Sequence, residues 1–399
     1  MSDNHGSTVE SKPLRVLHVL EATLGGTLRY MENIAEATEG LGLISGFAYG
    51  TARADSRLKP FLECISSRGW SSYPVDMARQ VQPLHDLKAC FRLRQVIAHF
   101  TPDIIHCHSS KAGALGRVAV FLKRDRPARV YSPHAVAAPL GSIYLKIEKL
   151  LSKSTDRFVA VSDSERREII SFSLARESSV SVVYPSVDSG YFQPMSRDVA
   201  RRTLDLGSTP LVLAIGRLTP QKDPASFLRI IKSVYDQQPD VRAIWVGSGE
   251  GEREFHDQVR AANMEHVVRL VPWQHDVRTY IAAADVFLST SRFESFGYVT
   301  AEALAMTRPV VASDVTGTLD IMSDRFTEWL YPQSRVDLAA DLVLRLLRDP
   351  LASVAIGNLG RREVERRFST ERMRDSLIGA YHSALGRPYV ELNPQIVAA

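Results

Sequence analysis

The chain has 399 residues, of which 45% are hydrophobic and 24% are charged, a balance typical of soluble globular proteins that excludes wholesale disorder. No apolar run approaches the ~20 residues of a membrane span, and residues 1–13 form a polar head, expected to be disordered, without the apolar core of a signal peptide. The three cysteines lack C-x-x-C spacing, which argues against disulfides and zinc and predicts a cytoplasmic protein.

The net charge of +4 is too small to predict nucleic-acid binding, but the charge is unevenly distributed. Residues 82–129 carry nine basic and three acidic side chains, a local excess of +6. This segment forms either an ordinary solvated helix face or a surface that contacts anionic headgroups at the cytoplasmic face of the inner membrane.

Short apolar strands alternate with helical patterns along the whole chain. In the first half, strands are predicted at 15–20, 103–108, 129–132, 158–162 and 180–184, with a helix at 27–41. In the second half, strands are predicted at 211–216, 241–247, 267–271, 286–289 and 309–312, with an amphipathic helix at 371–385. This alternation is typical of α/β proteins with parallel sheets, so we expect two Rossmann-like domains in tandem.

The expected boundaries follow from the polar segments between these patterns. A first domain is predicted at 14–194, a linker at 195–208 and a second domain at 209–370. The last segment, 371–399, is expected to be a helix that packs back on the first domain, followed by a tail. Ligands of such folds bind at the carboxyl ends of the strands, so a cleft is expected between the two domains.

Two glutamates flank a predicted helix start in the segment 291–312. Glu294 precedes the turn Phe296-Gly297, and Glu302 lies about 6 Å along the helix that follows. The unpaired N–H groups at a helix start suit a phosphate, and carboxylates accept hydrogen bonds from sugar diols. The pair therefore indicates a site for a phosphate between two sugar rings.

A second motif, 216–223, follows the strand at 211–216. It begins at Gly216 and places two permanent cations, Arg217 and Lys222, on one loop. Two cations on one loop match a diphosphate, because arginine can bind phosphate oxygens in a bidentate manner.

These motifs resemble the E-x7-E and G-R-x4-K signatures of the family 4 retaining glycosyltransferases, which have the GT-B fold, two Rossmann-like domains around a cleft. Members transfer a sugar from a nucleotide diphosphate sugar with retention of configuration, generally without a metal. The resemblance extends over about residues 14 to 385 and implies that domain 14–194 binds the acceptor and domain 209–370 the donor.

The resemblance also implies roles for single residues. Glu294 would contact the donor sugar and Glu302 the ribose, while Arg217 and Lys222 would bind the diphosphate. His134 ends a strand and would reach the donor sugar, which completes the predicted catalytic set. The predicted donor-binding residues are Gly25, Gly26, Gly216, Gly247, Gly249, Val271, Ser295, Phe296, Gly297 and Glu302.

The segment 108–117 reads H-S-S-K-A-G-A-L-G-R and is similar to a motif of bacterial polysaccharide and lipopolysaccharide members of the family. The resemblance implies an acceptor-side site at Ser109, Ser110 and Lys111. The alternative is a capped helix start with a solvent-facing Lys111.

The sequence thus predicts a metal-independent glycosyltransferase of bacterial surface polysaccharide synthesis, with a carbohydrate or lipid-linked acceptor. No two aspartates lie two residues apart, so no D-x-D motif is present to hold a metal against a diphosphate, and no cofactor is expected besides the nucleotide sugar. UDP is the expected carrier, with GDP next. The alternatives are a GT-B epimerase or hydrolase, and a nucleotide-sugar binding subunit without catalysis.

Overall fold

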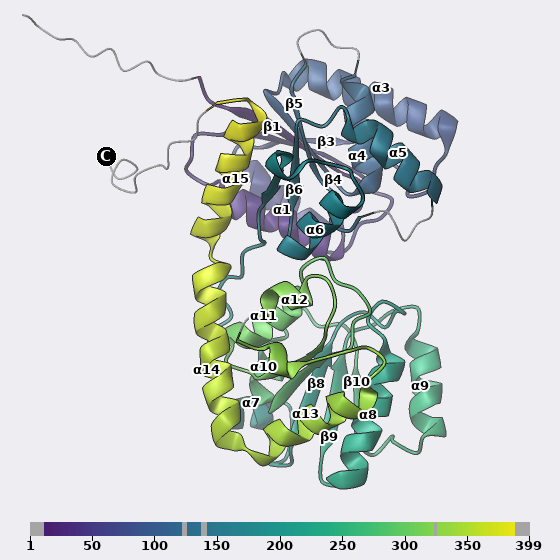
Figure 1. Cartoon of the computed structure of the whole chain (residues 1–399), viewed down its shortest axis with the longest axis vertical. Helices are drawn as coiled ribbons and strands as arrows, with labels where there is room; N and C mark the ends of the chain where they lie inside the picture. Colours follow the sequence, from purple (N-terminus) through teal and green to yellow (C-terminus); the bar gives the residue numbers. More distant parts are fainter. Residues whose placement is uncertain (1–11, 122–125, 137–141, 323–324, 388–399) are drawn as a thin grey trace, which may run out of the picture. The chain divides into compact units, whose positions relative to one another are not determined.

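The structure is a computed structural model that describes residues 12–121, 126–136, 142–322 and 325–387. The predicted head therefore lies almost wholly outside the described residues. The chain divides into two compact α/β units (Figure 1). Unit 1 comprises residues 1–160, 169–181 and 374–399, and unit 2 comprises residues 161–168 and 182–373. The predicted α/β class with two Rossmann-like parts is confirmed.

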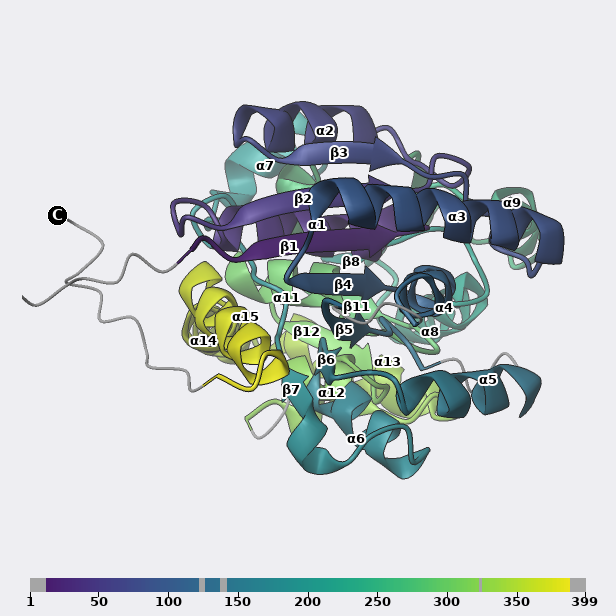
Figure 2. The ribbon, with the colours of Figure 1, turned by 90° about the horizontal axis from the view of Figure 1, so that it is seen from above.

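Unit 1 is built on a seven-stranded sheet with the order β3-β2-β1-β4-β5-β6-β7, which can be followed in Figure 2. The strands are β1 (Arg15–Leu20), β2 (Ile44–Tyr49), β3 (Ser71–Pro74), β4 (Ile104–His108), β5 (Ala128–Ser132), β6 (Arg157–Ala160) and β7 (Val180–Val182). The pairs from β3 to β6 are parallel. Sequence analysis missed β2, whose centre holds small residues, and β3, which is a short exposed edge strand.

Helices cover the unit 1 sheet. They are α1 (Gly25–Ala37), α2 (Leu58–Ser67), α3 (Pro83–Phe100), α4 (Ser110–Ala119), α5 (Ser142–Ser152), α6 (Asp163–Ser171, shared with unit 2) and the part of α15 (Thr370–Ala384) from Arg374 onward, with a 3-10 turn at Glu177–Ser179. Alternate residues of β1 and β4, such as Leu17 and Ile105, join a core cluster with apolar residues of α3 and α4. The residues between them, His18, His106 and His108, point to the other face, because successive side chains of a strand alternate.

Unit 2 has a six-stranded sheet with the order β10-β9-β8-β11-β12-β13. The strands are β8 (Leu211–Ile215), β9 (Arg242–Val246), β10 (Val268–Val271), β11 (Val286–Ser289), β12 (Val310–Ser313) and β13 (Leu330–Tyr331). The helices are α7 (Arg197–Thr203), α8 (Pro224–Gln237), α9 (Glu252–Ala261), α10 (Arg278–Ala283), α11 (Tyr298–Ala305), α12 (Thr318–Ile321), α13 (Val336–Arg348) and α14 (Pro350–Arg367), with a 3-10 turn at Thr327–Trp329. The strand order reverses at β8, so β8 and β11 lie at the topological switch point, where α/β sheets bind ligands.

The expected linker 195–208 is not an extended connection, because it contains α7. Arg201 of this helix is buried, with an ion pair of 2.7 Å to Asp285 and a hydrogen bond of 2.9 Å to the Ala283 carbonyl. The segment is therefore part of the unit 2 fold, whose longer stretch runs from Val182 to Met373.

A buried ion pair joins α4 to α5 in unit 1. The Arg117 guanidinium is fully buried, lies 2.5 Å from the Glu148 carboxylate and sits 4.0 Å above the centre of the Tyr131 ring. It also donates to the Gly113 carbonyl at 2.7 Å. The arginine that ends the motif 108–117 thus has a packing role.

We expect Arg117→Met to destabilise unit 1 by about 3–5 kcal/mol, because it leaves a buried carboxylate without its counter-charge. The double variant Arg117→Met/Glu148→Leu should recover much of this loss, since no uncompensated charge then remains. Urea denaturation of the full chain measures both effects. A double variant that is less stable than Arg117→Met would contradict this account.

Candidate active site

The predicted catalytic residues of unit 2 follow two neighbouring strands. Loop 216–223 leaves the carboxyl end of β8, and loop 290–297 leaves the carboxyl end of β11. Because β8 and β11 are adjacent and parallel, both loops emerge at the same edge of the sheet. The sheet topology thus brings together residues that are about 70 positions apart.

Lys222 and Glu294 meet at this edge. The Lys222 ammonium forms a short ion pair with Glu294 Oε1, and the Ser291 hydroxyl donates to the same oxygen at 2.7 Å. Both charged side chains are mostly buried, with exposed fractions of 21% and 12%. This geometry holds a cation and a carboxylate in one fixed position, where they can bind a phosphate and a sugar hydroxyl respectively.

Further hydrogen bonds hold the two loops together. The Thr290 hydroxyl donates to the Lys222 carbonyl at 2.8 Å, and the Arg292 N–H donates to the Gln221 carbonyl at 2.7 Å. The Arg292 side chain also forms an ion pair of 3.1 Å with Asp223, which caps α8. Contacts from loop 290–297 therefore hold the backbone at Lys222 and both of its neighbours in the chain.

The loop after β9 approaches the loop after β8 closely, which explains its glycines. Gly247 has φ +139°, and a Cβ there would lie 2.2 Å from the Gly216 carbonyl oxygen. A Cβ on Gly249 would lie 2.4 Å from the Leu218 carbonyl oxygen. The predicted glycines thus allow two loops to pack backbone against backbone, and their predicted contact with the nucleotide stays a prediction.

The second glutamate lies on α11, as predicted. Gly297 precedes the helix with φ +99°, and Glu302 is 9% exposed in its second turn. The Phe296 ring is buried against Phe368 and Tyr298, so only the backbone of this residue can serve a ligand. A small pocket of about 20 Å³ runs from Lys222 and Glu294 to Gly297 and Thr300.

The other predicted residues of unit 2 lie outside the ion-paired cluster. Arg217 is exposed and has no hydrogen bond or ion pair within the described part of the chain. Val271, at the end of β10, is buried, and Ser295 is half-buried between Glu294 and Phe296 in the chain. Arg217 therefore remains available for an anionic ligand.

In unit 1, Gly25 and Gly26 lie at the start of α1, as predicted. The Gly25 N–H donates to the Asp55 carboxylate at 2.9 Å, and Arg57 binds both this carboxylate and the Gly25 carbonyl. Apart from its chain neighbours and its own helix backbone, no atom of the described residues lies within 4 Å of the position of a Gly25 Cβ, so the described chain leaves this side of the turn open. Sequence analysis did not identify the two charged residues that hold the turn.

The predicted acceptor-side residues begin α4. The Ser109 hydroxyl is buried and has no hydrogen-bond partner among the described residues, whereas Ser110 bonds Tyr131. Lys111 forms an ion pair of 2.5 Å with Asp86 and donates to the Gln80 carbonyl at 2.9 Å. Lys111 is therefore tied to Asp86 of α3, which argues against the alternative of a solvent-facing ammonium. Its acceptor role stays a prediction.

His134 follows β5, as predicted, with φ +58°. Its Nε2 lies 3.2 Å from Nδ1 of His108, and Tyr30 packs edge-on against its ring at 4.9 Å. Burial lowers the pKa of His134 to about 3. The imidazole is therefore neutral at physiological pH.

Comparison with known proteins identifies the family. The family model described as "Glycosyl transferases group 1" matches residues 196–363, and the model described as "Glycosyltransferase Family 4" matches residues 24–191. A D-inositol 3-phosphate glycosyltransferase of Actinosynnema mirum is 32% identical over 312 residues, which are 71% of this chain and 72% of that protein. The chain belongs to the glycosyltransferases. It spans less of the relative of the same name in Mycobacterium tuberculosis, 62% of its length at 33% identity.

Solved structures agree with this glycosyltransferase fold. Anabaena Alr3699/HepE in complex with UDP has a TM-score of 0.79 at 20% identity, covering 93% of this chain and 100% of that chain. Sucrose-phosphate synthase from Thermosynechococcus elongatus has a TM-score of 0.78 at 18% identity, covering 93% and 99%. The two Rossmann-like units thus form a GT-B glycosyltransferase, as the motifs predicted.

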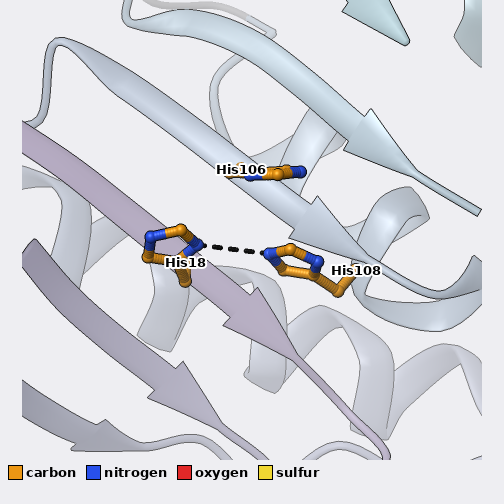
Figure 3. A group of neighbouring side chains, drawn as sticks. All are labelled: His18, His106 and His108. Carbon is orange, nitrogen blue, oxygen red and sulfur yellow. Dashed lines mark hydrogen bonds between the residues drawn. The ribbon is translucent and has the colours of Figure 1, made fainter. Parts of the chain in front are cut away.

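Several residues that shape the site of this glycosyltransferase were missed by sequence reasoning. Thr290 and Ser291 lie four and three residues before Glu294, and their hydroxyl groups were the only available signal. His18, His106 and His108 (Figure 3) were likewise given no role, although two histidines at alternate positions of a buried strand are an unusual pattern.

The histidines should make unit 1 of the glycosyltransferase labile to acid. Burial lowers the pKa of His18 and His134 to about 3 and those of His106 and His108 well below 6.5. The unfolded chain binds protons at these imidazoles below pH 6.5 and the folded chain does not, so their contribution to stability is complete above pH 6.5 and is lost as the pH falls toward 3.

Each imidazole should lower the free energy of unfolding by about 1.4 kcal/mol per pH unit well below pH 6.5. Urea denaturation at pH 7, 6, 5 and 4.5 measures this slope for unit 1. The variant His18→Leu should reduce the slope by the equivalent of one proton. Equal stability of unit 1 at pH 7 and pH 5 would contradict the neutral, buried state of these rings.

Proposed function

We propose that this glycosyltransferase is a retaining, metal-independent enzyme of bacterial surface polysaccharide synthesis. It transfers a sugar from a nucleotide diphosphate sugar to a carbohydrate or lipid-linked saccharide acceptor. The observation that carries this proposal is the contact between Lys222 and Glu294 beside the start of α11. A cation, a carboxylate and a helix N-terminus at one point match the diphosphate and the sugar of such a donor.

UDP is the proposed nucleotide. Structures of Anabaena Alr3699/HepE contain UDP, UDP with glucose, and UDP-glucose, and they share the fold of this chain at 19–20% identity. This likeness supports UDP as the first carrier to test, while the sugar is left to experiment.

Fixed positive charges support catalysis without a metal. The bond to the leaving diphosphate breaks as negative charge grows on its oxygen. Lys222 and the N–H groups at the start of α11 can stabilise that charge from fixed positions, and the exposed Arg217 can add a further positive charge. The sequence also offers no D-x-D pair to hold a divalent ion.

The state of His134 supports retention of configuration. An inverting enzyme needs a base opposite the leaving group, and His134, which the resemblance places near the donor sugar, is the candidate considered for that role. Because burial lowers the pKa of His134 to about 3, its imidazole is a weak base at neutral pH. In the alternative, front-face route, a leaving phosphate oxygen accepts the proton of the attacking hydroxyl, and no protein base is required.

A panel of nucleotide sugars tests the proposal. The purified enzyme is incubated with UDP-, GDP- and ADP-sugars, with and without a lipid-linked saccharide, and with EDTA. We expect release of UDP that depends on the acceptor and survives EDTA, and a product with the anomeric configuration of the donor. Turnover of the donor without an acceptor would favour the epimerase or hydrolase, and tight binding without turnover would favour the binding subunit.

Lys222→Ala and Arg217→Ala should each lower kcat by about 10²–10³-fold, or ~3–4 kcal/mol, because each removes a cation from the leaving group. Circular dichroism and kcat are measured together. The control is Lys232→Ala, which removes an exposed lysine paired with Asp236 on α8 and should leave kcat unchanged. Near-normal turnover in both site variants would contradict the diphosphate role.

The two glutamates should differ on mutation. Glu302→Ala should weaken the binding of free UDP, because the ribose hydroxyls lose their acceptor, whereas Glu294→Ala should leave UDP affinity intact and impair use of the sugar donor. Calorimetry with UDP and kinetics with the donor separate the two effects. Equal loss of UDP affinity in both variants would refute this division of roles.

We further propose that helices α3, α4 and α5 carry a surface that docks on an anionic membrane, where a lipid-linked acceptor would lie. Among the described residues no helix is long and apolar enough to cross a bilayer, so docking would be peripheral. Large apolar side chains are nevertheless exposed on these neighbouring helices and two residues after the end of α4, at Phe121: Leu84, Leu87, Phe91, Val118, Phe121, Ile147 and Leu150.

The charges of this surface support an anionic partner. Exposed basic side chains lie beside the apolar ones: Lys88, Arg92 and Arg94 on α3, Lys146 and Lys149 on α5, and Lys153 just after it. The two acidic residues of the three helices, Asp86 and Glu148, are neutralised by Lys111 and Arg117. Basic and apolar side chains in alternation are typical of segments that lie in a membrane interface.

The charge reversals Lys146→Glu, Lys149→Glu and Lys153→Glu together should abolish binding to phosphatidylglycerol vesicles at low salt, since each lysine contributes about 1 kcal/mol near an anionic surface. Phe121→Ser should weaken the part of the binding that persists at high salt. Three other basic residues of segment 82–129 are left unchanged in this test, because Lys123 and Arg124 lie outside the described residues and Arg126 pairs with Asp156 at 3.0 Å. If neither the triple charge reversal nor Phe121→Ser changes the amount of protein that sediments with the vesicles, this surface does not bind the membrane.

A further inference from the structure

Two loops of unit 2 are joined by a crossed pair of salt bridges. Each loop supplies one cation and one carboxylate, and each cation binds the carboxylate of the other loop. Lys222 of the loop after β8 pairs with Glu294 of the loop after β11. In the opposite direction, Arg292 of the loop after β11 pairs at 3.1 Å with Asp223, the residue that follows Lys222. The first pair belongs to the proposed donor site, whereas the second has no assigned role.

Asp223 is a buried carboxylate in an unusual backbone conformation. It is 8% exposed and has φ +49°, in the left-handed region that residues other than glycine seldom adopt. Its side chain caps α8 by accepting hydrogen bonds from the N–H and the hydroxyl of Ser226, at 3.2 and 2.7 Å. Burial would raise the pKa of this carboxyl, but the hydrogen bonds from Arg292 and Ser226 outweigh burial and hold the pKa below its ordinary value. Asp223 is therefore ionised at neutral pH and requires a cation.

Arg292 supplies that cation and is itself held at three points. Its Nε donates to the Asp223 carboxylate, its backbone N–H donates to the Gln221 carbonyl at 2.7 Å, and its own carbonyl accepts from the Gln333 amide at 2.7 Å. Among the residues that the structure describes, no other cation lies within ion-pair distance of Asp223. Because the guanidinium side chain is 55% exposed, a variant that lacks it should still fold.

The position of the Lys222 ammonium depends on these contacts. Arg292 holds both chain neighbours of this lysine, Gln221 through its backbone N–H and Asp223 through its guanidinium. The Lys222 stem lies close against Gly216, because a Cβ on Gly216 would be 3.2 Å from the lysine Cγ, Cδ and Cε. A stem confined in this way has little freedom to compensate for a displaced backbone, so a shift of the loop also moves the ammonium.

The crossed arrangement also assigns each charge to one partner. Asp223 directly follows Lys222 in the chain, so an unpaired Asp223 carboxylate would compete with Glu294 for the lysine ammonium, since a buried charge without a partner is costly. Because Arg292 neutralises Asp223, the ammonium is left to Glu294 and to an anionic ligand.

We propose that Asp223 and Arg292 are positioning residues, whose ion pair fixes the Lys222 ammonium opposite Glu294 and holds the two loops together as one rigid body. Neither residue of the pair needs to touch the donor for this role. That a well-placed ammonium raises the rate of sugar transfer rests on the proposed function, whereas the coupling of the two loops does not.

Hydrogen–deuterium exchange of the full chain tests the coupling of the loops. Peptides that cover residues 219–227 and 289–296 are followed by mass spectrometry in the wild type and in Arg292→Ala. We expect about tenfold faster exchange in both peptides of the variant, because loss of the guanidinium releases Asp223 and with it the start of α8.

Arg345→Ala is the matched control for this measurement. Arg345 also lies in unit 2, is 60% exposed and forms an ion pair of 3.1 Å with Glu328, so it matches Arg292 in exposure and pairing but lies outside the two loops. Its removal should leave the exchange of both peptides and kcat unchanged.

A double-variant cycle tests whether the ion pair acts through Lys222. With the nucleotide sugar identified by the panel, Arg292→Ala should lower kcat about tenfold, and Arg292→Lys should stay within about threefold of the wild type. In a Lys222→Ala background, Arg292→Ala should change kcat by less than about twofold, because the ammonium that it positions is already absent. A general structural role would instead give the same fold loss in both backgrounds.

Three results would overturn the proposal. They are unchanged exchange of residues 219–227 in Arg292→Ala, an equal loss of kcat with and without Lys222, and the same effects in Arg345→Ala. If Arg292→Ala does not fold, the same measurements on Arg292→Gln, which removes the charge and keeps a polar side chain, decide the question. An inactive wild type with the expected exchange pattern would count against the proposed function only.

Discussion

The ion pair between Lys222 and Glu294 is the interaction on which the arrangement of the unit 2 site depends. Neither charge is well solvated, so each requires the other when no ligand is present. The pair forms only because β8 and β11 are neighbours and their loops leave the same edge of the sheet. Ser291, Thr290 and Arg292 then fix the loops, and the glycines after β9 let a third loop pack beneath them. A donor diphosphate would therefore enter a site whose charges are already oriented.

Unit 1 adds neutral groups to its ion pairs. Beside the pairs of Lys111 with Asp86 and of Arg57 with Asp55, it presents imidazoles and hydroxyls, and burial keeps the imidazoles uncharged. The difference fits the expected division of labour in a GT-B enzyme. A diphosphate requires positive charge, whereas a sugar is recognised through hydroxyl groups, for which neutral donors and acceptors suffice.

Much of this organisation was readable from the sequence. Strands β8 and β11 are apolar runs that end at polar motifs, so the position of Lys222 and Glu294 at a sheet edge could be predicted. Their direct contact could not, because it depends on two side chains 72 positions apart. The ion pair of Lys111 was missed for the same reason, because its partner Asp86 lies on another helix. α7 was read as a linker because a seven-residue helix with three arginines lacks an apolar periodicity, and its stability comes from Arg201 and Asp285.

The path of the chain between the units has a consequence for biosynthesis. Unit 1 is completed only by residues from 374 onward, where Tyr381 of α15 binds His106 beneath the sheet. The ribosome makes these residues after all of unit 2. Unit 2 can thus fold before they are made, whereas the part of unit 1 that precedes residue 161 must wait, with part of its sheet uncovered, until α15 has been made. Loss of the last turns of α15 would remove the hydroxyl that binds the buried His106, 275 residues upstream of Tyr381.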